Sequence, residues 1–247
     1  MEKNKKSVVI NIKNLKKSFG DQKVLDGVTM QLHKEENLVV LGKSGSGKSV
    51  LIKCIVRLLD HDEGSITVGK HELTDIDEED LIAVRKKIGF LFQSAALYDS
   101  MTVRENLTFA LSRNDEKFSK EEQNHKIVEA LENVGLPDAI DKMPSELSGG
   151  MKKRIGLART LVVNPSIILY DEPTTGLDPI TSDEISNLIN DTKVKFKNAS
   201  IIITHDMKCV KTVADRIVML KDGKIYKEGS LEAFVTDNDP YIQSFFK

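Results

Sequence analysis

Eight consecutive residues in the first quarter of the chain set its architecture: Gly42, Lys43, Ser44, Gly45, Ser46, Gly47, Lys48 and Ser49. A short apolar run, Asn37–Leu41, comes directly before them, and apolar residues at helical spacing follow over Val50–Leu59. Glycines in such a segment let successive backbone N–H groups turn toward an anion, and the following helix adds the positive end of its dipole. The order of strand, glycine-rich loop and helix therefore matches the phosphate-binding pattern G-x-x-x-x-G-K-[ST].

The last two residues of this loop carry the chemistry expected for a bound nucleoside triphosphate. Lys48 is expected to reach the β- and γ-phosphates, and the Ser49 hydroxyl is expected to ligate Mg²⁺. A glycine-rich turn without any ligand is the alternative, and the flanking strand and helix argue against it.

Composition and charge narrow the class of protein. The 247 residues are 40% hydrophobic and 30% charged, as in a folded globular protein rather than a disordered one. Lys and Arg number 36 against 38 Asp and Glu, so the net charge of −2 excludes a uniformly basic nucleic-acid binder, and no nucleic-acid partner is expected. The two cysteines, Cys54 and Cys209, are too few for a disulfide scaffold and indicate free thiols in a reducing cytosol. No apolar run approaches the ~18 residues that a membrane-spanning helix needs.

Strand and helix patterns alternate along most of the chain, which predicts an α/β fold with a parallel central sheet. Two alternating segments near the start are expected to pair antiparallel through a connection at Phe19–Gly27: Val8–Lys13 and Val28–His33. The buried strands expected besides Asn37–Leu41 are Ile88–Phe92, Ile167–Tyr170 and Ser200–Thr204.

The character of the sequence changes between Gln93 and Pro165, where no segment has a strand pattern. One helix is expected to begin at Ser119, with Glu122 completing a capping box, and to run to Val134. Another is expected from about Ser148 to Val163. We interpret this stretch as a helical lobe inserted into the α/β domain.

A second motif, Ile167–Glu172, ends a buried strand with two carboxylates. In an open α/β sheet, the carboxyl end of such a strand lies beside the phosphate-binding loop. Asp171 suits Mg²⁺ binding, and Glu172 is placed to polarise a water toward the γ-phosphate. The alternative is an ordinary acidic pair at a strand end, which the phosphate-binding loop makes less attractive.

A third motif, Leu147 followed by Ser148, Gly149 and Gly150, opens a helix. A serine N-cap followed by two glycines forms a second anion-binding helix end. Taken alone it is weak, because the same residues also make a plain loop.

Together these motifs resemble the nucleotide-binding subunit of ABC transporters, over nearly the whole chain from about Val8 to Lys247. The resemblance implies an ATP-hydrolysing P-loop NTPase with a RecA-like core, an N-terminal antiparallel β-lobe and an inserted helical lobe. Residues 1–93 and 164–230 would form the core with its β-lobe, 94–163 the helical lobe, and 231–247 a C-terminal helical extension. It also implies ATP and Mg²⁺ as cofactors, and a head-to-tail dimer with a second copy.

The same resemblance implies roles for individual residues. Phe19 looks like the aromatic that stacks on adenine, although a strand-end aromatic that packs locally is the alternative. Gln93 looks like the glutamine that contacts Mg²⁺ or the attacking water, and His205 like the switch histidine near the γ-phosphate. Asp178 looks like the acid at the dimer seam, and Ser148–Gly150 would close over the ATP held by the other subunit.

Further segments are similar to the ATPase of the Mla/MCE-associated phospholipid transport system: Met151–Arg154, Gln93–Leu107, Asp178–Ser182 and Asn238–Phe246. This implies integral membrane permease subunits and an MCE-domain lipid-binding protein as partners, at the cytoplasmic face of the inner (cell) membrane. The ATPase of a small-solute importer and a non-transport assembly ATPase of the iron–sulfur type are the alternatives. The C-terminal segment either covers its own domain or reaches the neighbouring ATPase subunit.

The segment Ala95–Glu105, directly after Gln93, mixes small, apolar and charged residues. We expect it to border a groove that receives a cytoplasmic helix of a permease, with Tyr98 and Met101 at the contact. The alternative is an ordinary loop of the helical lobe.

Replacing Lys48 with alanine should weaken nucleotide binding and abolish hydrolysis, because a phosphate-neutralising charge is lost. The loss of binding free energy should be at least the contribution of one charge-assisted hydrogen bond, ~1.5–3 kcal/mol. Titration of Lys48→Ala with a fluorescent ATP analogue measures it, and wild-type affinity would contradict the assignment.

Overall fold

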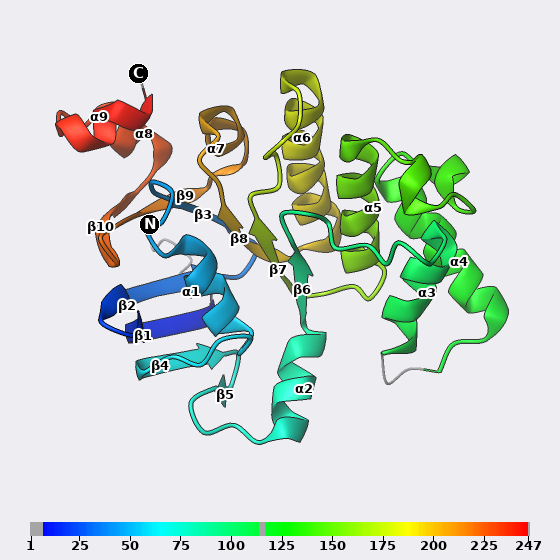
Figure 1. Cartoon of the computed structure of the whole chain (residues 1–247), viewed down its shortest axis with the longest axis horizontal. Coiled ribbons are helices and arrows are strands. Elements are labelled where there is room, and N and C mark those ends of the chain that lie inside the picture. The colour runs from blue at the N-terminus through cyan, green and yellow to red at the C-terminus, as the bar shows by residue number, and fades with distance from the viewer. Residues whose placement is uncertain (1–6, 114–116, 247) are drawn as a thin grey trace, which may run out of the picture.

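The computed structural model describes residues 7–113 and 117–246, and the ends of the predicted domain, residues 1–6 and 247, lie outside them. An outer antiparallel sheet, in the order β2-β1-β4-β5, lies at the lower left of Figure 1. Its strands are β1 (Val8–Phe19), β2 (Gln22–His33), β4 (Glu63–Val68) and β5 (His71–Glu72). This sheet is the expected N-terminal antiparallel lobe.

The central sheet has the order β10-β9-β3-β8-β7-β6. Its strands are β3 (Asn37–Leu41), β6 (Ile88–Leu91), β7 (Ile167–Asp171), β8 (Ala199–Ile203), β9 (Arg216–Lys221) and β10 (Lys224–Gly229). All neighbours pair parallel except β9 and β10, which form an antiparallel hairpin at one edge. The predicted parallel central sheet is therefore confirmed.

Helices pack around this sheet; those between β6 and β7 fill the right side of Figure 1, and the C-terminal helices lie at its upper left. They are α1 (Lys48–Ile55), α2 (Glu78–Lys86), α3 (Val103–Ser112), α4 (Lys120–Asn133), α5 (Gly149–Leu161), α6 (Pro179–Phe196), α7 (Met207–Val213), α8 (Leu231–Val235) and α9 (Pro240–Phe246), with short 3₁₀ turns η1 (Pro137–Ala139) and η2 (Pro144–Glu146). Within the described parts of 94–163 no strand forms, in line with the strand-free sequence pattern. The exact lobe boundaries stay a prediction.

Helix N-caps follow the sequence closely. Ser119 caps α4 and exchanges hydrogen bonds with Glu122, so the expected capping box is confirmed. Ser148 caps α5 by accepting from the Met151 N–H. These signals act within one turn of the chain, which is why local sequence reveals them.

The expected bounds of β1, β2 and α1 were wrong. β1 continues to Phe19 and meets β2 at Gln22, so the connection is a tight hairpin rather than a long link over 19–27. The register of β1 shifts at Asn14, where φ is 49°, and this bulge disrupts the apolar alternation that marks a strand. Helix α1 begins two residues earlier than expected and ends at Ile55, before Arg57 with its φ of 54°.

The core lies on both faces of the central sheet. Side chains of β3 alternate between two buried clusters, with Val39 facing the helices α3–α7 and Val40 facing α1 and the outer sheet. A parallel sheet covered on both faces gives the continuous apolar runs seen in its sequence. The C-terminal helix α9 packs on this same body through the buried Ile242 and through Tyr241, whose ring lies 5.1 Å from the Lys43 ammonium.

Replacing Gly64 with alanine should lower the free energy of unfolding by about 2–4 kcal/mol. Gly64 has a φ of +91°, and a Cβ there would lie 2.4 Å from the carbonyl oxygen of Asn14 at the bulge. Gly69→Ala is the matched control, since Gly69 has a φ of +60° but nothing within 4 Å, and it should cost only about 1 kcal/mol. Urea unfolding measures both, and equal losses would mean that the close approach is unimportant.

Candidate functional site

A cleft of about 600 Å³ opens at the carboxyl edge of the central sheet. Four parallel strands end there, and the residues just after β3, β6, β7 and β8 include the glycine-rich loop, Gln93, Glu172 and His205. The cleft is lined by Phe19, Val24, Ser44, Gly45, Gly47, Lys48, Ser49, Val50, Gln93, Glu172 and His205. Ligands of open α/β sheets bind at this edge.

The glycine-rich loop is tightly packed at two of its glycines. A Cβ at Gly47, whose φ is +99°, would lie 2.7 Å from the Val24 carbonyl oxygen. A Cβ at Gly42 would lie 2.5 Å from the Leu220 carbonyl oxygen and 2.6 Å from the Ser46 hydroxyl. The Ser46 Oγ is buried without a hydrogen-bond partner among the described residues. A polar atom left unpaired within the loop is consistent with a phosphate-binding segment.

Lys48 occupies the start of α1 and is only 6% exposed. Its ammonium donates to the carbonyl oxygens of Gly42 at 2.8 Å and Lys43 at 2.9 Å, which holds it across the loop. Burial lowers the pKa of Lys48, while the negative charges of Glu172 and Asp171 act in the opposite direction. A buried cation with carbonyl partners at the mouth of a cleft suits an anionic ligand.

Ser49 and Asp171 form the pair that fits a magnesium ion. The Ser49 hydroxyl donates to Asp171 Oδ1 at 2.9 Å, and Asp171 is buried at the end of β7. Both supply hard oxygen ligands, and Gln93 at the cleft adds a third ligand, its side-chain amide oxygen. Over residues 7–113 and 117–246, no group of three or more His, Cys, Asp or Glu side chains could hold a metal by itself. The donor set therefore fits Mg²⁺ if phosphate oxygens and water supply the remaining ligands.

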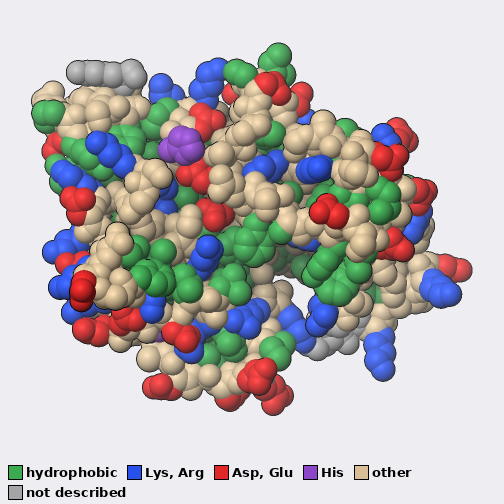
Figure 2. All heavy atoms as spheres, in the orientation of Figure 1, with side chains coloured by type: hydrophobic (Ala, Val, Ile, Leu, Met, Phe, Trp, Pro, Cys, Tyr) green, Lys and Arg blue, Asp and Glu red, His purple; other side chains and the backbone are tan. Residues whose placement is uncertain are grey.

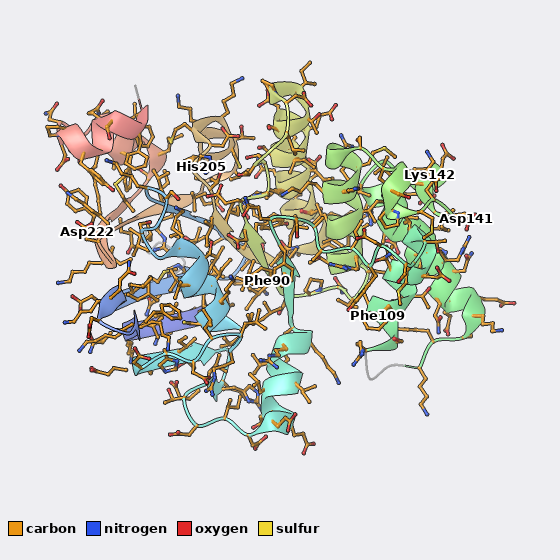
Figure 3. All side chains as sticks on the ribbon, in the orientation of Figure 1. Phe90, Phe109, Asp141, Lys142, His205 and Asp222 are labelled. Carbon is orange, nitrogen blue, oxygen red and sulfur yellow. The ribbon has the colours of Figure 1, made fainter. Side chains whose placement is uncertain are left out.

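Glu172 and His205 meet across the top of the cleft. The Glu172 carboxylate lies 2.8 Å from the His205 ring Nδ1 and accepts a hydrogen bond from the Thr175 hydroxyl at 3.1 Å. The Glu172 side chain is 13% exposed, whereas His205 is 62% exposed on the loop between β8 and α7 (Figure 3). A shielded carboxylate with an exposed imidazole beside it can orient a water molecule and accept its proton.

Phe19 lies at the end of β1 and is 48% exposed at the rim of the cleft. The Lys17 ammonium lies 5.4 Å from the centre of its ring. The exposed ring is free to stack on a base, and its cation–π contact is also compatible with local packing. Both sequence-based interpretations of Phe19 therefore stay open.

The remaining predicted site residues lie outside this cleft. Ser148, Gly149 and Gly150 begin α5, where a Cβ at Gly150 would lie 2.5 Å from Thr181 Cγ2. Asp178 caps α6 by accepting from two backbone N–H groups and the Thr181 hydroxyl, and these hydrogen bonds lower its pKa. The two helix starts thus pack on each other, away from Lys48 in the same chain.

Sequence reasoning missed Lys153 as a site residue. It is 5% exposed on α5, and its ammonium donates to the main-chain oxygens of Gln93 and Glu172. The signal available was its spacing of three and four residues from Gly156 and Leu157, which places a lysine on the buried face of the helix.

Comparison with known proteins identifies the class. Residues 25–175 match the family model described as ABC transporter. The chain therefore belongs to the ABC transporter family, and it is an ATPase that binds and hydrolyses ATP.

Particular relatives refine this. The Arabidopsis thaliana protein TRIGALACTOSYLDIACYLGLYCEROL 3, chloroplastic, is 37% identical over 98% of this chain and 74% of its own length. The methionine import ATP-binding protein MetN of Brucella abortus is 36% identical over 97% of this chain, which spans 64% of that relative. A solved dimeric ATP-binding cassette bound to ADP and phosphate superposes with a TM-score of 0.82 and 31% identity, covering 90% of this chain and 98% of that one.

Replacing Glu172 with glutamine should keep ATP binding but lower turnover by roughly 10²–10⁴, because the amide cannot take the proton of the attacking water. Measured ATPase rates and nucleotide titration separate the two effects. Near-normal turnover would mean that Glu172 is not the general base.

Proposed function

We propose that this chain is the ATP-hydrolysing subunit of an ABC transporter that powers phospholipid trafficking through separate membrane subunits. The observation that carries the lipid assignment is the relative named for trigalactosyldiacylglycerol, a galactolipid, which aligns over 98% of this chain. The segments Met151–Arg154 and Asp178–Ser182 support the same branch. Among residues 7–113 and 117–246, none of the helices has the length and apolar character of a membrane span.

In the proposed mechanism, the loop Gly42–Ser49 would hold the phosphates of ATP, and Ser49, Asp171 and Gln93 would hold Mg²⁺. The ion would neutralise charge that develops on the phosphate oxygens. Glu172 accepts the proton of the attacking water, and His205, 2.8 Å away, keeps the carboxylate oriented toward the phosphate end. These side chains lie at or just beyond the ends of four strands of one sheet, and Asp171 and Glu172 both belong to the end of β7.

We further propose a head-to-tail dimer. Ser148 and Lys48 belong to separate surfaces of one chain, because Ser148–Gly150 do not line the cleft that contains Lys48. A second copy would bring its α5 N-terminus, a ready anion-binding end, to the open side of the cleft. The dimeric cassette that superposes with a TM-score of 0.82 supports this arrangement. Asp178, which caps α6 beside Gly150, would lie at the seam.

A groove of about 460 Å³ between α2, β6, α3 and α5 is the proposed docking place of a permease helix. Figure 2 shows the molecule hollowed between α2 and α3, with basic side chains around the opening. The groove is lined by Ile82, Arg85, Lys86, Ile88, Ala110, Arg113 and Val163.

No residue of the predicted contact segment, Ala95–Glu105, lines this groove. The exposed Tyr98 packs edge-on against Phe109 at 5.0 Å, and Arg113 lies 4.8 Å from the same ring. This chain of contacts leads from the loop after Gln93 to the groove, so a shift of the loop would reach a bound helix. An MCE-domain protein and a position at the cytoplasmic membrane face complete the proposal.

The methionine importer relative, 36% identical, favours a second candidate, a small-solute importer ATPase. The two functions differ in the cargo that ATP hydrolysis moves, so the test compares cargoes directly.

A Tyr98→Cys variant should crosslink to an integral membrane subunit in cells of the source organism, whereas Tyr226→Cys, a similarly exposed tyrosine on β10, should not. The crosslinked partner is then co-purified with the wild-type chain and reconstituted in phospholipid vesicles. ATP-dependent transfer of a fluorescent phospholipid is expected, without uptake of labelled methionine. Methionine uptake alone would establish the importer, and a Tyr98→Cys chain that labels only soluble proteins would favour an assembly ATPase.

A further inference from the structure

Helix α5 lies unusually close to the loop that follows β6. A Cβ at Gly156 would lie 2.9 Å from Leu91 Cδ1 and 3.0 Å from the Ala95 Cβ, both below ordinary contact distance. On the next turn, Thr160 Cγ2 lies 2.3 Å from where a Cβ on Gly89 would stand. The small residues therefore let the helix backbone approach the segment that carries Gln93, and side chains on this face reach its main chain.

Two cations on this face hold the loop. Lys153 donates to the carbonyl oxygen of Gln93. Arg159 donates to the carbonyl oxygens of Ala95 at 3.0 Å and Ala96 at 2.7 Å. Ala95 and Ala96 have φ values of 61° and 48°, a conformation that residues with a Cβ rarely adopt. The charge-assisted hydrogen bonds therefore fix a loop shape that its own residues disfavour.

Lys153 differs from Arg159 because it bridges two elements. Its ammonium also donates to the carbonyl oxygen of Glu172 at 3.2 Å, at the end of β7. Burial lowers the pKa of Lys153, and the charges of Asp171 and Glu172 oppose that shift. A single buried cation thus joins the main chain of Gln93 to that of Glu172.

The backbone of Glu172 needs this support. Its φ is 52°, in the left-handed region, where a residue with a Cβ is held only by its surroundings. Its N–H donates to the Ile203 carbonyl at 2.9 Å, and its own carbonyl accepts from Lys153 and, at 3.3 Å, from the Thr175 N–H. The turn determines the direction of the Glu172 side chain, which meets His205 at the cleft.

We propose that Lys153 is a positioning residue for ATP hydrolysis, which ties the helix that begins at Ser148 to the main chain of both Gln93 and Glu172. The proposal rests on the proposed function, in which Glu172 is the general base and the Ser148 end of α5 meets the nucleotide of a second copy. Movement of α5 on that contact is passed through Lys153 to the Gln93 and Glu172 of its own chain. In this way, the nucleotide bound at one site would affect the catalytic residues of the other site.

The test uses the purified full chain with Lys153→Met and Lys153→Arg. Lys153→Met should lower kcat by about 10- to 100-fold, because small misplacement of a catalytic group has effects of this size. KM for ATP and the affinity for a fluorescent ATP analogue should stay within about 3-fold of wild type. The substitution leaves unchanged the interactions that bind ATP equally in the ground state and in the transition state. Lys153→Arg, which keeps a cation able to reach both carbonyls, should recover most of the activity. Lys152→Met removes the same charge from the neighbouring, less buried position and should behave as wild type.

A double variant shows whether Lys153 acts through Glu172. If it does, Lys153→Met with Glu172→Gln should turn over no more slowly than Glu172→Gln alone. The proposal would be overturned if the loss of kcat in the double variant equalled the product of the two single losses. A wild-type kcat in Lys153→Met would also overturn it. So would equal loss of kcat and nucleotide affinity.

Two further outcomes are separated by the same set of variants. If Lys153→Met does not fold, as judged by thermal unfolding, Lys153→Gln takes its place, and a folded but inactive arginine variant then counts against the proposal. If Glu172→Gln alone keeps wild-type turnover, the proposed base is wrong, whatever Lys153 does. If Lys153→Met has normal activity while Glu172→Gln is inactive, only the positioning role of Lys153 is wrong, and the proposed function stands.

Discussion

Parallel pairing of β3, β8, β7 and β6 is the constraint on which the rest of the molecule depends. Because these strands run in one direction, the segments that follow them all emerge at one edge. The glycine-rich loop, Gln93, Glu172 and His205 each follow one of the four strands. A change in the direction of any one strand would carry its functional residue to the opposite edge of the sheet. The sheet therefore sets the position of the site, and the side chains supply its chemistry.

Two buried lysines and one pair of acidic residues lie together at this edge of the sheet. Lys48 and Lys153 both donate to main-chain oxygens, and burial lowers the pKa of each. Asp171 and Glu172 oppose that shift at both lysines. Burial of charge is costly unless partners are present, so the acid pair and the carbonyl oxygens together keep both cations where they are. Lys48 faces the proposed phosphate position, while Lys153 faces the supporting main chain.

The dimer is proposed because the start of α5 does not line the cleft of its own chain. Two helix starts, those of α5 and α6, pack against each other through Gly150 and Thr181, outside the cleft. The α5 start, with its neutral serine cap, is the kind of group that binds a triphosphate, whereas the Asp178 carboxylate already occupies the start of α6. In the proposed function, the same helix α5 therefore presents one end to a partner's nucleotide and holds the catalytic loops of its own chain by its buried face. A rigid helix is suited to this double duty because it moves as one body.

The sequence by itself determined the local elements of this protein. The phosphate-binding loop, the acid pair at 171–172 and the caps at Ser119 and Ser148 are patterns confined to a few consecutive residues. It did not determine the hairpin ends of β1 and β2, since the bulge at Asn14 hides the alternation. The tertiary structure alone decided that β3 lies between β8 and β9, that Glu172 touches His205, and that Lys153 is buried against two strand ends. These contacts join segments distant in sequence, and they depend on which strands pair and how closely a helix approaches them, which no local pattern encodes.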